Sequence, residues 1–178
     1  AETPEGASVG IVKNLSYLSH VTIYSNSNGL YDYIMPLITT LTSIKDDYEK
    51  IYNNTKVFIN GSWVGITENP LELYNDLKEK KYKGIINIYT SIVFDTKLLE
   101  IRVCNDAGRL SRPLFKVKNN DFVYNYYDKN SIFNKLKNNE LTWSDLCYSG
   151  NIDESIIEYV DSYEQNNSMI AMVGKKLN

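Results

Sequence analysis

The sequence predicts an α+β fold: a single mixed domain with β-hairpins, several short helices and a loop-rich N-terminal arm. Three observations support this prediction: an Asn-Gly turn between two β-rich runs at residues 56–66, helical spacing of apolar residues on both sides of it, and further β-rich runs over residues 85–118. No internal repeat or low-complexity linker interrupts the 178 residues. An arm followed by one body is therefore the simplest architecture.

The first half is predicted to contain two short strands, a helix and a hairpin. Apolar stretches at 9–12 and 21–24 favour strands, and apolar residues over 30–44 recur at spacings of three and four, which predicts a helix kinked by Pro36. Both central positions of a type I′ turn need positive φ, so Asn60-Gly61 indicates a hairpin.

A second helix follows the hairpin. Asn69 is its expected cap, Pro70 its first residue, and Gly84 its end. Its buried side is predicted to carry Leu71, Leu73, Tyr74 and Leu77. The lysine-rich turn at 80–83 could bind phosphate, but a solvated helix C-terminus that complements the helix dipole explains it more simply.

The second half is predicted to hold mainly strands and short helices. We expect strands at 91–95 and 98–104, a turn at 105–108 and a strand at 109–118 that Pro113 places at a sheet edge or a bulge. A helix is expected at 130–136, a short helix capped by Thr142, and strands at 156–160 and 169–173. Residues 140–164 contain seven acids and no Lys or Arg, which predicts a face turned away from nucleic acid.

Composition restricts the class of protein. Apolar residues make up 43% and charged residues 23%, proportions that exclude disordered, collagen-like and membrane-spanning chains. Nineteen basic residues against 22 acidic ones give a net charge of −3, so any contact with phosphates must be local. Cys104 and Cys147 are too few for a disulfide-stapled fold or a zinc site, which favours a cytosolic or nuclear protein. The missing initiator Met predicts a processed chain or an excised segment.

No motif resembles an active site, so we expect neither a catalytic residue nor a metal ligand. His20 is the only histidine, which excludes multi-histidine metal sites and favours a satisfied structural role. No glycine-rich loop matches a phosphate-binding or dinucleotide motif. Asp46 and Asp47 are adjacent, and neighbouring side chains do not face each other, so they make a poor metal clamp.

Four basic residues occur within ten positions that contain no acid: Arg109, Arg112, Lys116 and Lys118. Alternate residues of a strand share a face, so these side chains could line a nucleic-acid channel. The favoured alternative is structural. Arg109 and Arg112 would pair with Asp106 and neighbouring carbonyl groups and brace the turn that contains Gly108.

Five short motifs occur in one order along the chain. They lie at residues 2–6 with 10–16, at 57–65, at 105–115, at 143–144, and at 157–161 with 168–172. Together they resemble the second-largest subunit of multisubunit RNA polymerases, in its eukaryotic and archaeal form. Residues 121–139 depart from that family's pattern and, with the heavy use of Asn, Lys, Ile and Tyr, favour a large DNA virus as the source.

The resemblance implies a segment of a DNA-directed RNA polymerase, which is a nucleotidyltransferase. Residues 1–25 would be the end of the fork region and residues 26–178 the external domain on the outer side of the cleft. The magnesium of such an enzyme is held mainly by its largest subunit and the zinc of the clamp lies further along the parent chain, so no cofactor and no complete active site are expected here.

The resemblance also implies partners and a location. The partners would be other polymerase subunits, especially the largest, with template DNA and RNA reached through the assembled enzyme and no membrane. The location would be the cytoplasm or virion for a viral protein and the nucleus for a cellular one. The residues expected nearest nucleic acid are Glu2, Thr3, Pro4, Glu5, Gly6 and, as a phosphate contact, Lys13.

Two other functions stay open at this point. One is a free-standing interaction module derived from a polymerase subunit. The other is a small hydrolase that uses Ser or Cys with His20, although no nucleophile elbow or oxyanion motif accompanies that histidine.

Overall fold

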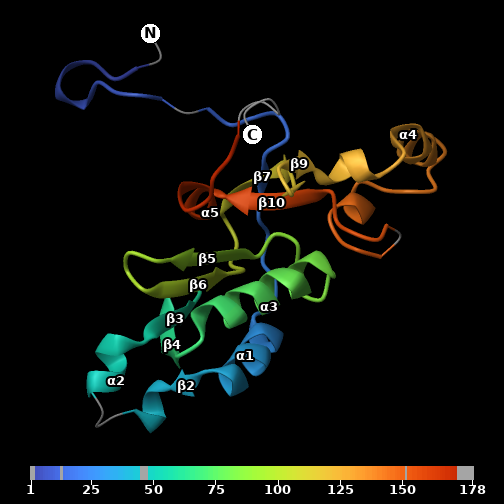
Figure 1. The fold of residues 1–178 in the computed structure, drawn as a ribbon. Coiled ribbons are helices and arrows are strands. Elements are labelled where there is room, and N and C mark those ends of the chain that lie inside the picture. Colours follow the sequence, from blue (N-terminus) through green and yellow to red (C-terminus); the bar gives the residue numbers. More distant parts are fainter. Residues whose placement is uncertain (1–2, 13, 45–47, 151, 172–178) are drawn as a thin grey trace.

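The computed structural model describes residues 3–12, 14–44, 48–150 and 152–171, and combines helices and strands as the α+β prediction requires (Figure 1). The α-helices are α1 (Asn28–Ile34), α2 (Tyr48–Asn53), α3 (Pro70–Tyr82), α4 (Lys129–Lys137) and α5 (Ser162–Asn166). The strands are β1 (His20–Val21), β2 (Thr39–Thr40), β3 (Thr55–Ile59), β4 (Ser62–Thr67), β5 (Ser91–Asp95), β6 (Glu100–Cys104), β7 (Leu110–Phe115), β8 (Val117–Lys118), β9 (Asp121–Phe122) and β10 (Ile157–Asp161). Short 3₁₀ helices lie at Gly6–Ser8, Met35–Leu37, Leu41–Ser43, Val123–Tyr126 and Ser144–Leu146.

The larger sheet has the strand order β2-β4-β3-β6-β5 and grows from the predicted hairpin. Asn60 and Gly61 both have positive φ, 47° and 81°, as a type I′ turn demands. β6 runs parallel to β3, so the chain must cross over between them, and α3 forms that crossover. The hairpin prediction is confirmed.

An apolar core lies between this sheet and the helices α1 and α3. Alternate residues of β3 point inward, and α3 presents Leu73 and Leu77 to them. The buried members of this first cluster are Leu30, Ile34, Val57, Ile59, Leu73, Leu77, Ile92, Ile101 and Val103.

A second apolar cluster lies against the sheet β1-β7-β10, in the upper part of Figure 1. Its buried members are Val123, Leu146, Cys147, Ile156, Ile157 and Tyr159. α3 contacts β5 of the larger sheet, and its Lys81 donates to the carbonyl of Tyr159 on β10. The body therefore contains two apolar clusters with a polar junction between α3 and β10.

Several predicted elements have different bounds. The helix expected over 30–44 ends at Ile34, continues as the 3₁₀ turn with Pro36, and is followed by β2, which pairs with β4. Sheet pairing replaces the helix here because proline cannot donate the next backbone hydrogen bond. Residues 9–12 and 169–171 form no strand, and 172–173 lie outside the described residues.

The helix α3 has the expected bounds but differs in detail. The side chain of Asn69 makes no capping hydrogen bond, and Leu71 is 62% exposed rather than buried. Gly84 follows with φ of 74°, as expected for a residue that ends a helix.

At Pro113 one side of its strand is unpaired, which agrees with the predicted edge position. It lies in β7, the central strand of its sheet, but β1 pairs only with Leu110 and Ser111. At Pro113 the strand is therefore paired with β10 alone, through Tyr159. A missing N–H is tolerated on such an open side.

Candidate functional site

The N-terminal arm extends from the body at the upper left of Figure 1 and is exposed throughout its described residues before Ser19. The loop expected near nucleic acid is described from Thr3 onward: Thr3, Pro4, Glu5 and Gly6 are exposed, and Gly6 has φ of 81°. Glu2, Lys13, Asp46 and Asp47 lie outside the described residues. Whether this loop contacts nucleic acid stays a prediction.

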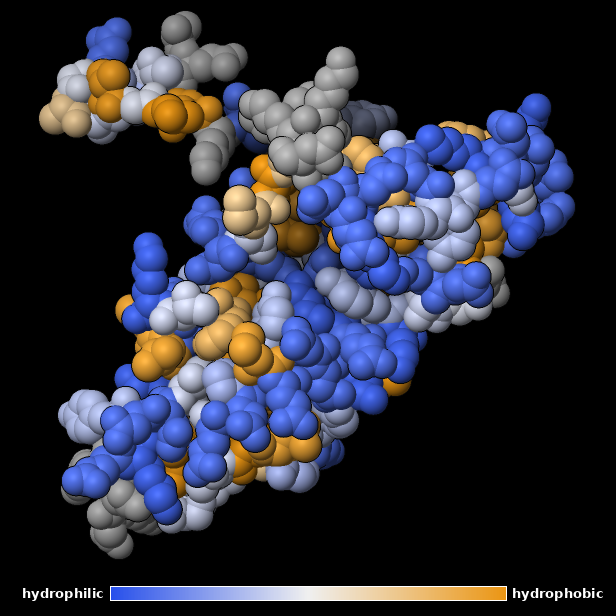
Figure 2. Space-filling model, in the orientation of Figure 1, coloured by the Kyte–Doolittle hydropathy of each residue, from blue (hydrophilic) through white to orange (hydrophobic). Residues whose placement is uncertain are grey.

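Apolar side chains are unusually exposed on the arm, and Figure 2 shows several of them as orange groups. They are Val9, Ile11, Val12, Leu15, Tyr17 and Leu18, with Ile11 93% and Tyr17 fully exposed. Contiguous exposure of this kind is typical of a surface that packs against other polypeptide.

The arm joins the body at the turn between Asn105 and Arg109. Thr22 donates its main-chain N–H to the carbonyl of Arg109 and accepts from the N–H of Gly108, both at 2.9 Å. Its hydroxyl donates to the carbonyl of Asp106 at 3.0 Å and accepts from the N–H of Arg109 at 3.0 Å. The turn is thus clamped by a residue more than 80 positions earlier.

Arg109 pairs with the groups that brace this turn. Its Nε lies 2.7 Å from the Asp106 carboxylate, one terminal nitrogen 2.9 Å from Asp161 Oδ2, and the other donates to the carbonyl of Tyr89 at 3.0 Å. The planar guanidinium fork suits this arrangement, which a lysine would not reproduce. The second carboxylate oxygen of Asp161 accepts from the N–H of Glu164 at 2.7 Å and caps α5.

The four basic residues of 109–118 do not form one exposed stripe. The side chains of Arg109 and Lys116 are 16% and 11% exposed, whereas that of Lys118 is 55% exposed. Arg112 is half-buried, and its Nε has no hydrogen-bond partner within the described part of the chain. A nucleic-acid contact through these residues stays a prediction.

Asn60 and Asn105, which belong to two different motifs, pair with each other, and the sequence does not predict this. Asn60, in the hairpin turn, accepts from the N–H of Asn105 at 2.9 Å and donates to its side-chain oxygen at 2.8 Å. Asn105 also accepts at its carbonyl from the hydroxyl of Ser25 at 2.9 Å. The residues of the 57–65 and 105–115 motifs therefore meet in space, although nothing in their spacing indicates it.

His20 and the thiols give little support to the hydrolase hypothesis. The His20 ring stacks on Tyr89 with 4.3 Å between ring centroids. Its Nε2 is buried without a hydrogen-bond partner among the described residues, so the prediction of a satisfied histidine is wrong at this nitrogen. Burial raises the pKa of Cys147 to about 11 and also raises that of Cys104, which favours neutral thiols at both positions.

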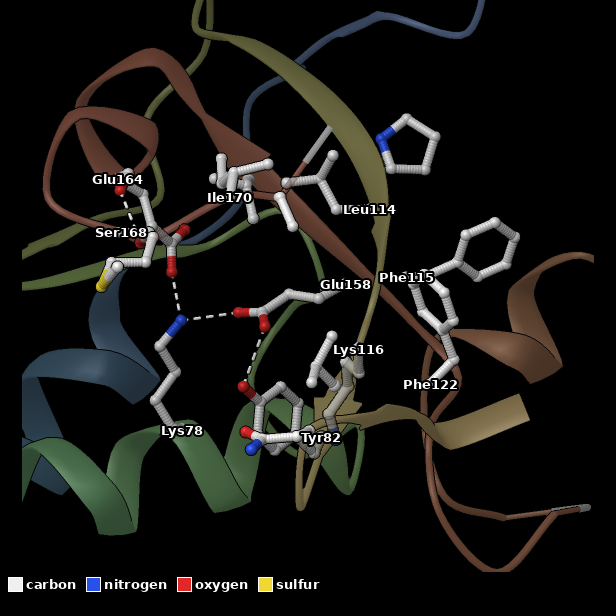
Figure 3. Close-up of a pocket in the computed structure, with 16 residues that line it drawn as sticks. Lys78, Tyr82, Leu114, Phe115, Lys116, Phe122, Glu158, Glu164, Ser168 and Ile170 are labelled. Atoms are coloured by element: carbon white, nitrogen blue, oxygen red, sulfur yellow. Dashed lines mark hydrogen bonds and ion pairs between the residues drawn. The ribbon is translucent and has the colours of Figure 1, made fainter. Parts of the chain in front are cut away.

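An ion-pair network fills the junction between α3 and β10; it consists of Lys78, Lys81, Tyr82, Glu158 and Glu164. Figure 3 shows its members other than Lys81. Lys78 Nζ lies 2.6 Å from Glu158 and also contacts Glu164. Lys81 Nζ lies 3.4 Å from Glu158 and donates to the carbonyl of Tyr159 at 2.9 Å. Tyr82 donates its hydroxyl to Glu158 at 2.9 Å.

The predicted solvated lysine turn is therefore wrong at Lys81, which is 2% exposed. Lys81 follows Leu73 and Leu77 at intervals of four, so it continues the buried face of α3 toward β10. That spacing is the one signal that could have identified it from sequence.

The acids of residues 140–164 do not form one exposed face, and whether this region points away from nucleic acid stays a prediction. Asp145, Asp161 and Glu164 are buried, and the side chain of Glu158 is 14% exposed. These carboxylates pair with Lys, Arg, hydroxyl and main-chain N–H groups; Asp145, for example, accepts from both the N–H and the hydroxyl of Thr142 at 2.7 Å. Asp161, Glu158 and Glu164 thus find their basic partners in segments distant in the sequence.

The two glutamates of the network differ in their titration. Burial alone would raise the pKa of Glu158, but Lys81 and Lys78 lower it to about 2. Burial raises the pKa of Glu164 despite the same lysines. Burial likewise opposes the charge of Lys78, yet Glu158 and Glu164 raise its pKa above the usual value. Glu158 is thus the firmly ionised partner.

A groove of about 1030 Å³ opens beside this network (Figure 3). Its polar floor includes Lys78, Glu158 and Lys116, and its other walls come from β7, β9 and residues 168–171. Among the residues that the structure describes, no group of three or more His, Cys, Asp and Glu side chains is arranged to hold a metal ion. No described helix has the length and apolar character to cross a bilayer.

Residues 57–118 match the family described as RNA polymerase Rpb2, domain 4. The chain is 39% identical to DNA-directed RNA polymerase II subunit RPB2 of Encephalitozoon cuniculi, covering 99% of this chain and 15% of that protein. It is 32% identical to DNA-directed RNA polymerase II subunit 2 of Arabidopsis thaliana and 31% identical to DNA-directed RNA polymerase subunit 2 of Acanthamoeba polyphaga mimivirus, covering 97% and 96% of this chain and 14% of each relative.

These similarities confirm the family that the five motifs indicate. The relatives come from cellular organisms and from a virus, so a viral source stays a prediction. The chain spans 14–15% of the length of these relatives. It is homologous to one segment of the second-largest subunit of DNA-directed RNA polymerases, with domain 4 at residues 57–118.

Proposed function

We propose that this chain serves DNA-templated transcription as a non-catalytic segment of a polymerase second-largest subunit, at the end of the fork and the external wall of the cleft. The observation that carries the proposal is similarity over 96–99% of the chain to 14–15% of known second subunits. A segment of that size supplies a surface and a scaffold, and the magnesium and zinc of the parent enzyme belong to polypeptide outside it.

The exposed arm supports this role. Ile11, Leu15 and Tyr17 belong to a run of exposed apolar side chains, and such a run is typical of a surface that packs against other polypeptide. We propose that they pack against the rest of the fork or against another subunit, the largest being the principal candidate. The Thr3–Gly6 loop would then approach the nucleic acid, with an intracellular location that depends on the source: cytoplasm, virion or nucleus.

Assembly of the full-length subunit that contains this chain tests the proposal. Replacing Ile11 and Leu15 together by Asp should abolish co-purification with the largest subunit, because two charges would be buried without partners. The matched control is Phe133→Asp, on α4, where the side chain is 69% exposed outside the arm. This control should co-purify normally.

Two results would overturn the proposal. Template-dependent RNA synthesis by the purified 178-residue chain alone would show a complete active site in this segment. Normal assembly of the arm variant would remove the assigned role of the arm and favour the free-standing interaction module.

A further inference from the structure

Four lysines face three glutamates around the groove. The lysines are Lys78, Lys81, Lys116 and Lys118, and the glutamates are Glu154, Glu158 and Glu164. Lys78 and Lys81 both pair with Glu158 and Glu164, so those four charges balance. Lys116 and Lys118 are left to share Glu154.

The sharing between these two lysines is unequal. Lys118 Nζ lies 2.9 Å from Glu154 Oε2, whereas Lys116 Nζ lies 3.9 Å from Glu154 Oε1. Lys116 instead donates to the hydroxyl of Ser155 at 2.9 Å and lies 3.6 Å from the centroid of the Tyr82 ring. The positive charge of Lys116 therefore contacts mainly neutral groups.

Burial makes that charge costly. The side chain of Lys116 is 11% exposed, and burial lowers its pKa, in contrast to Lys78. A buried cation gains most from a carboxylate at hydrogen-bond distance, and no glutamate of this cluster lies within 3.5 Å of Lys116. Among the four lysines, Lys116 is thus the one without a carboxylate of the described residues at hydrogen-bond distance.

The wall beside Lys116 is apolar and partly exposed. It consists of Leu114, Phe115, Val117 and Phe122, and Figure 3 shows the two phenylalanines next to Lys116. Phe115 is 57% and Val117 45% exposed. Within the described structure, β1 pairs with no residue of β7 beyond Ser111. The edge of β7 beside this wall is therefore open to an extended segment.

We propose that this groove binds an extended acidic–hydrophobic segment of a partner protein. One Asp or Glu carboxylate of that segment pairs with Lys116, and an adjacent apolar side chain covers Phe115 and Val117. A single carboxylate supplies the close partner that Lys116 lacks. A dianionic phosphate is disfavoured because Glu158 and Glu154 lie on the same side of the molecule as Lys116. This inference goes beyond the proposed function and does not depend on the arm.

Fluorescence anisotropy with the 178-residue chain tests the proposal. The probe is a fluorescein-labelled peptide with the core Leu-Asp-Phe, and its matched control has Leu-Asn-Phe. The Asp peptide should bind at least about tenfold more tightly, the ratio expected for one charge-assisted hydrogen bond. Its affinity should fall as salt concentration rises.

Protein variants locate the site. Lys116→Gln should weaken binding of the Asp peptide by about tenfold or more, and Lys116→Arg should restore much of it. Lys135→Gln removes an exposed lysine of α4 that lies outside the groove and should change the affinity less than about twofold. Thermal unfolding of each variant shows whether it is folded, and the Asp–Asn comparison on the unaltered chain stands even where a variant is not.

Four results would each overturn the proposal. They are equal affinity for the Asp and Asn peptides, an undiminished affinity in folded Lys116→Gln, an equal loss in Lys135→Gln, and tighter binding of a single-stranded RNA of similar length than of the Asp peptide.

Discussion

The five-stranded sheet and the α3–β10 junction are both buried, but different interactions hold them together. Val57 and Ile101 of the sheet pack with Leu77 of α3 among other apolar side chains. In the junction, Lys81 and Glu164, both 2% exposed, are matched charges from segments more than 80 positions apart. The first arrangement gains free energy from each buried methylene, whereas the second gains little net energy but depends on every partner being present.

Burial alone therefore does not determine how much unfolding free energy a substitution costs. Shortening an apolar side chain leaves a cavity that its neighbours can partly close. Removing one charge from the junction leaves the opposite charge in a low-dielectric environment, which no packing adjustment repairs. The two regions should therefore respond differently to substitutions of similar size.

The largest effect is expected for Lys81→Met. The methionine keeps the length of the side chain but leaves the carbonyl of Tyr159 without its lysine and reduces the positive charge beside Glu158 and Glu164. Loss of one partner of a buried ion pair costs about 3–5 kcal/mol of unfolding free energy. Urea unfolding measures this. Lys83→Met is the control, because the Lys83 side chain is 50% exposed, and its curve should overlay that of the unaltered chain. Equal losses of unfolding free energy in Lys81→Met and Lys83→Met would contradict the expected difference between a buried and an exposed lysine.

The next effect concerns acid. The pKa of Glu158 falls from an ordinary value of 4.5 to about 2 on folding, so its contribution to stability is present above pH 4.5 and is lost as the pH falls through about 2. By linkage this contribution is about 3 kcal/mol. Glu158→Gln should flatten the fall in unfolding free energy over that pH range, measured by urea unfolding at several pH values.

Glu164→Gln is the control for the acid effect. Burial raises the pKa of Glu164 above its ordinary value of 4.5, so its folded carboxyl binds a proton more readily than the unfolded one. Its contribution to stability therefore rises as the pH falls through the folded pKa and is complete below pH 4.5. This variant should keep the acid-induced loss that Glu158 causes. The same flattening in both variants would show that Glu158 is not the firmly ionised member.

Local signals predicted the parts of the fold that depend on neighbours in sequence. Asn60-Gly61 identified the hairpin because a type I′ turn needs positive φ at two adjacent positions, and Pro70 and Gly84 marked the ends of α3. By contrast, the short strand β2 at Thr39–Thr40 exists because β4 pairs with it, which no spacing within 30–44 reveals.

The candidate site was predictable only where one motif contained both partners. Asp106 and Arg109 are three residues apart, so their pairing follows from the turn, but Asp161 as the second partner of Arg109 does not. Lys116 and Glu154 carry ordinary surface charges in the sequence, and the groove that makes Lys116 unusual forms only when β7 packs beside α3. The roles of the Thr3–Gly6 loop remain predictions.

A smaller loss is expected for Arg109→Lys. Lysine keeps the charge but replaces a fork that contacts Asp106, Asp161 and the carbonyl of Tyr89 by one ammonium group. Loss of one or two charge-assisted hydrogen bonds predicts a decrease of about 2 kcal/mol in unfolding free energy. Arg102→Lys is the control, since that side chain is 38% exposed and pairs with Glu100 on its own strand. A loss in the control as large as in Arg109→Lys would show that any arginine fork matters equally.

The smallest effect, and the direct test of the comparison, is Ile101→Val in the apolar core. Ile101 is fully buried, and removal of one methylene there costs about 1 kcal/mol. Combined with Lys81→Met, the two losses in unfolding free energy should add to within about 0.5 kcal/mol, because Ile101 packs in the first apolar cluster whereas Lys81 bonds to residues of β10 and α5. Urea unfolding of the double variant measures the sum. A coupling well beyond that margin would mean that α3 transmits strain between the sheet and the junction, and the two regions would then behave as one cooperative core with charges at its edge.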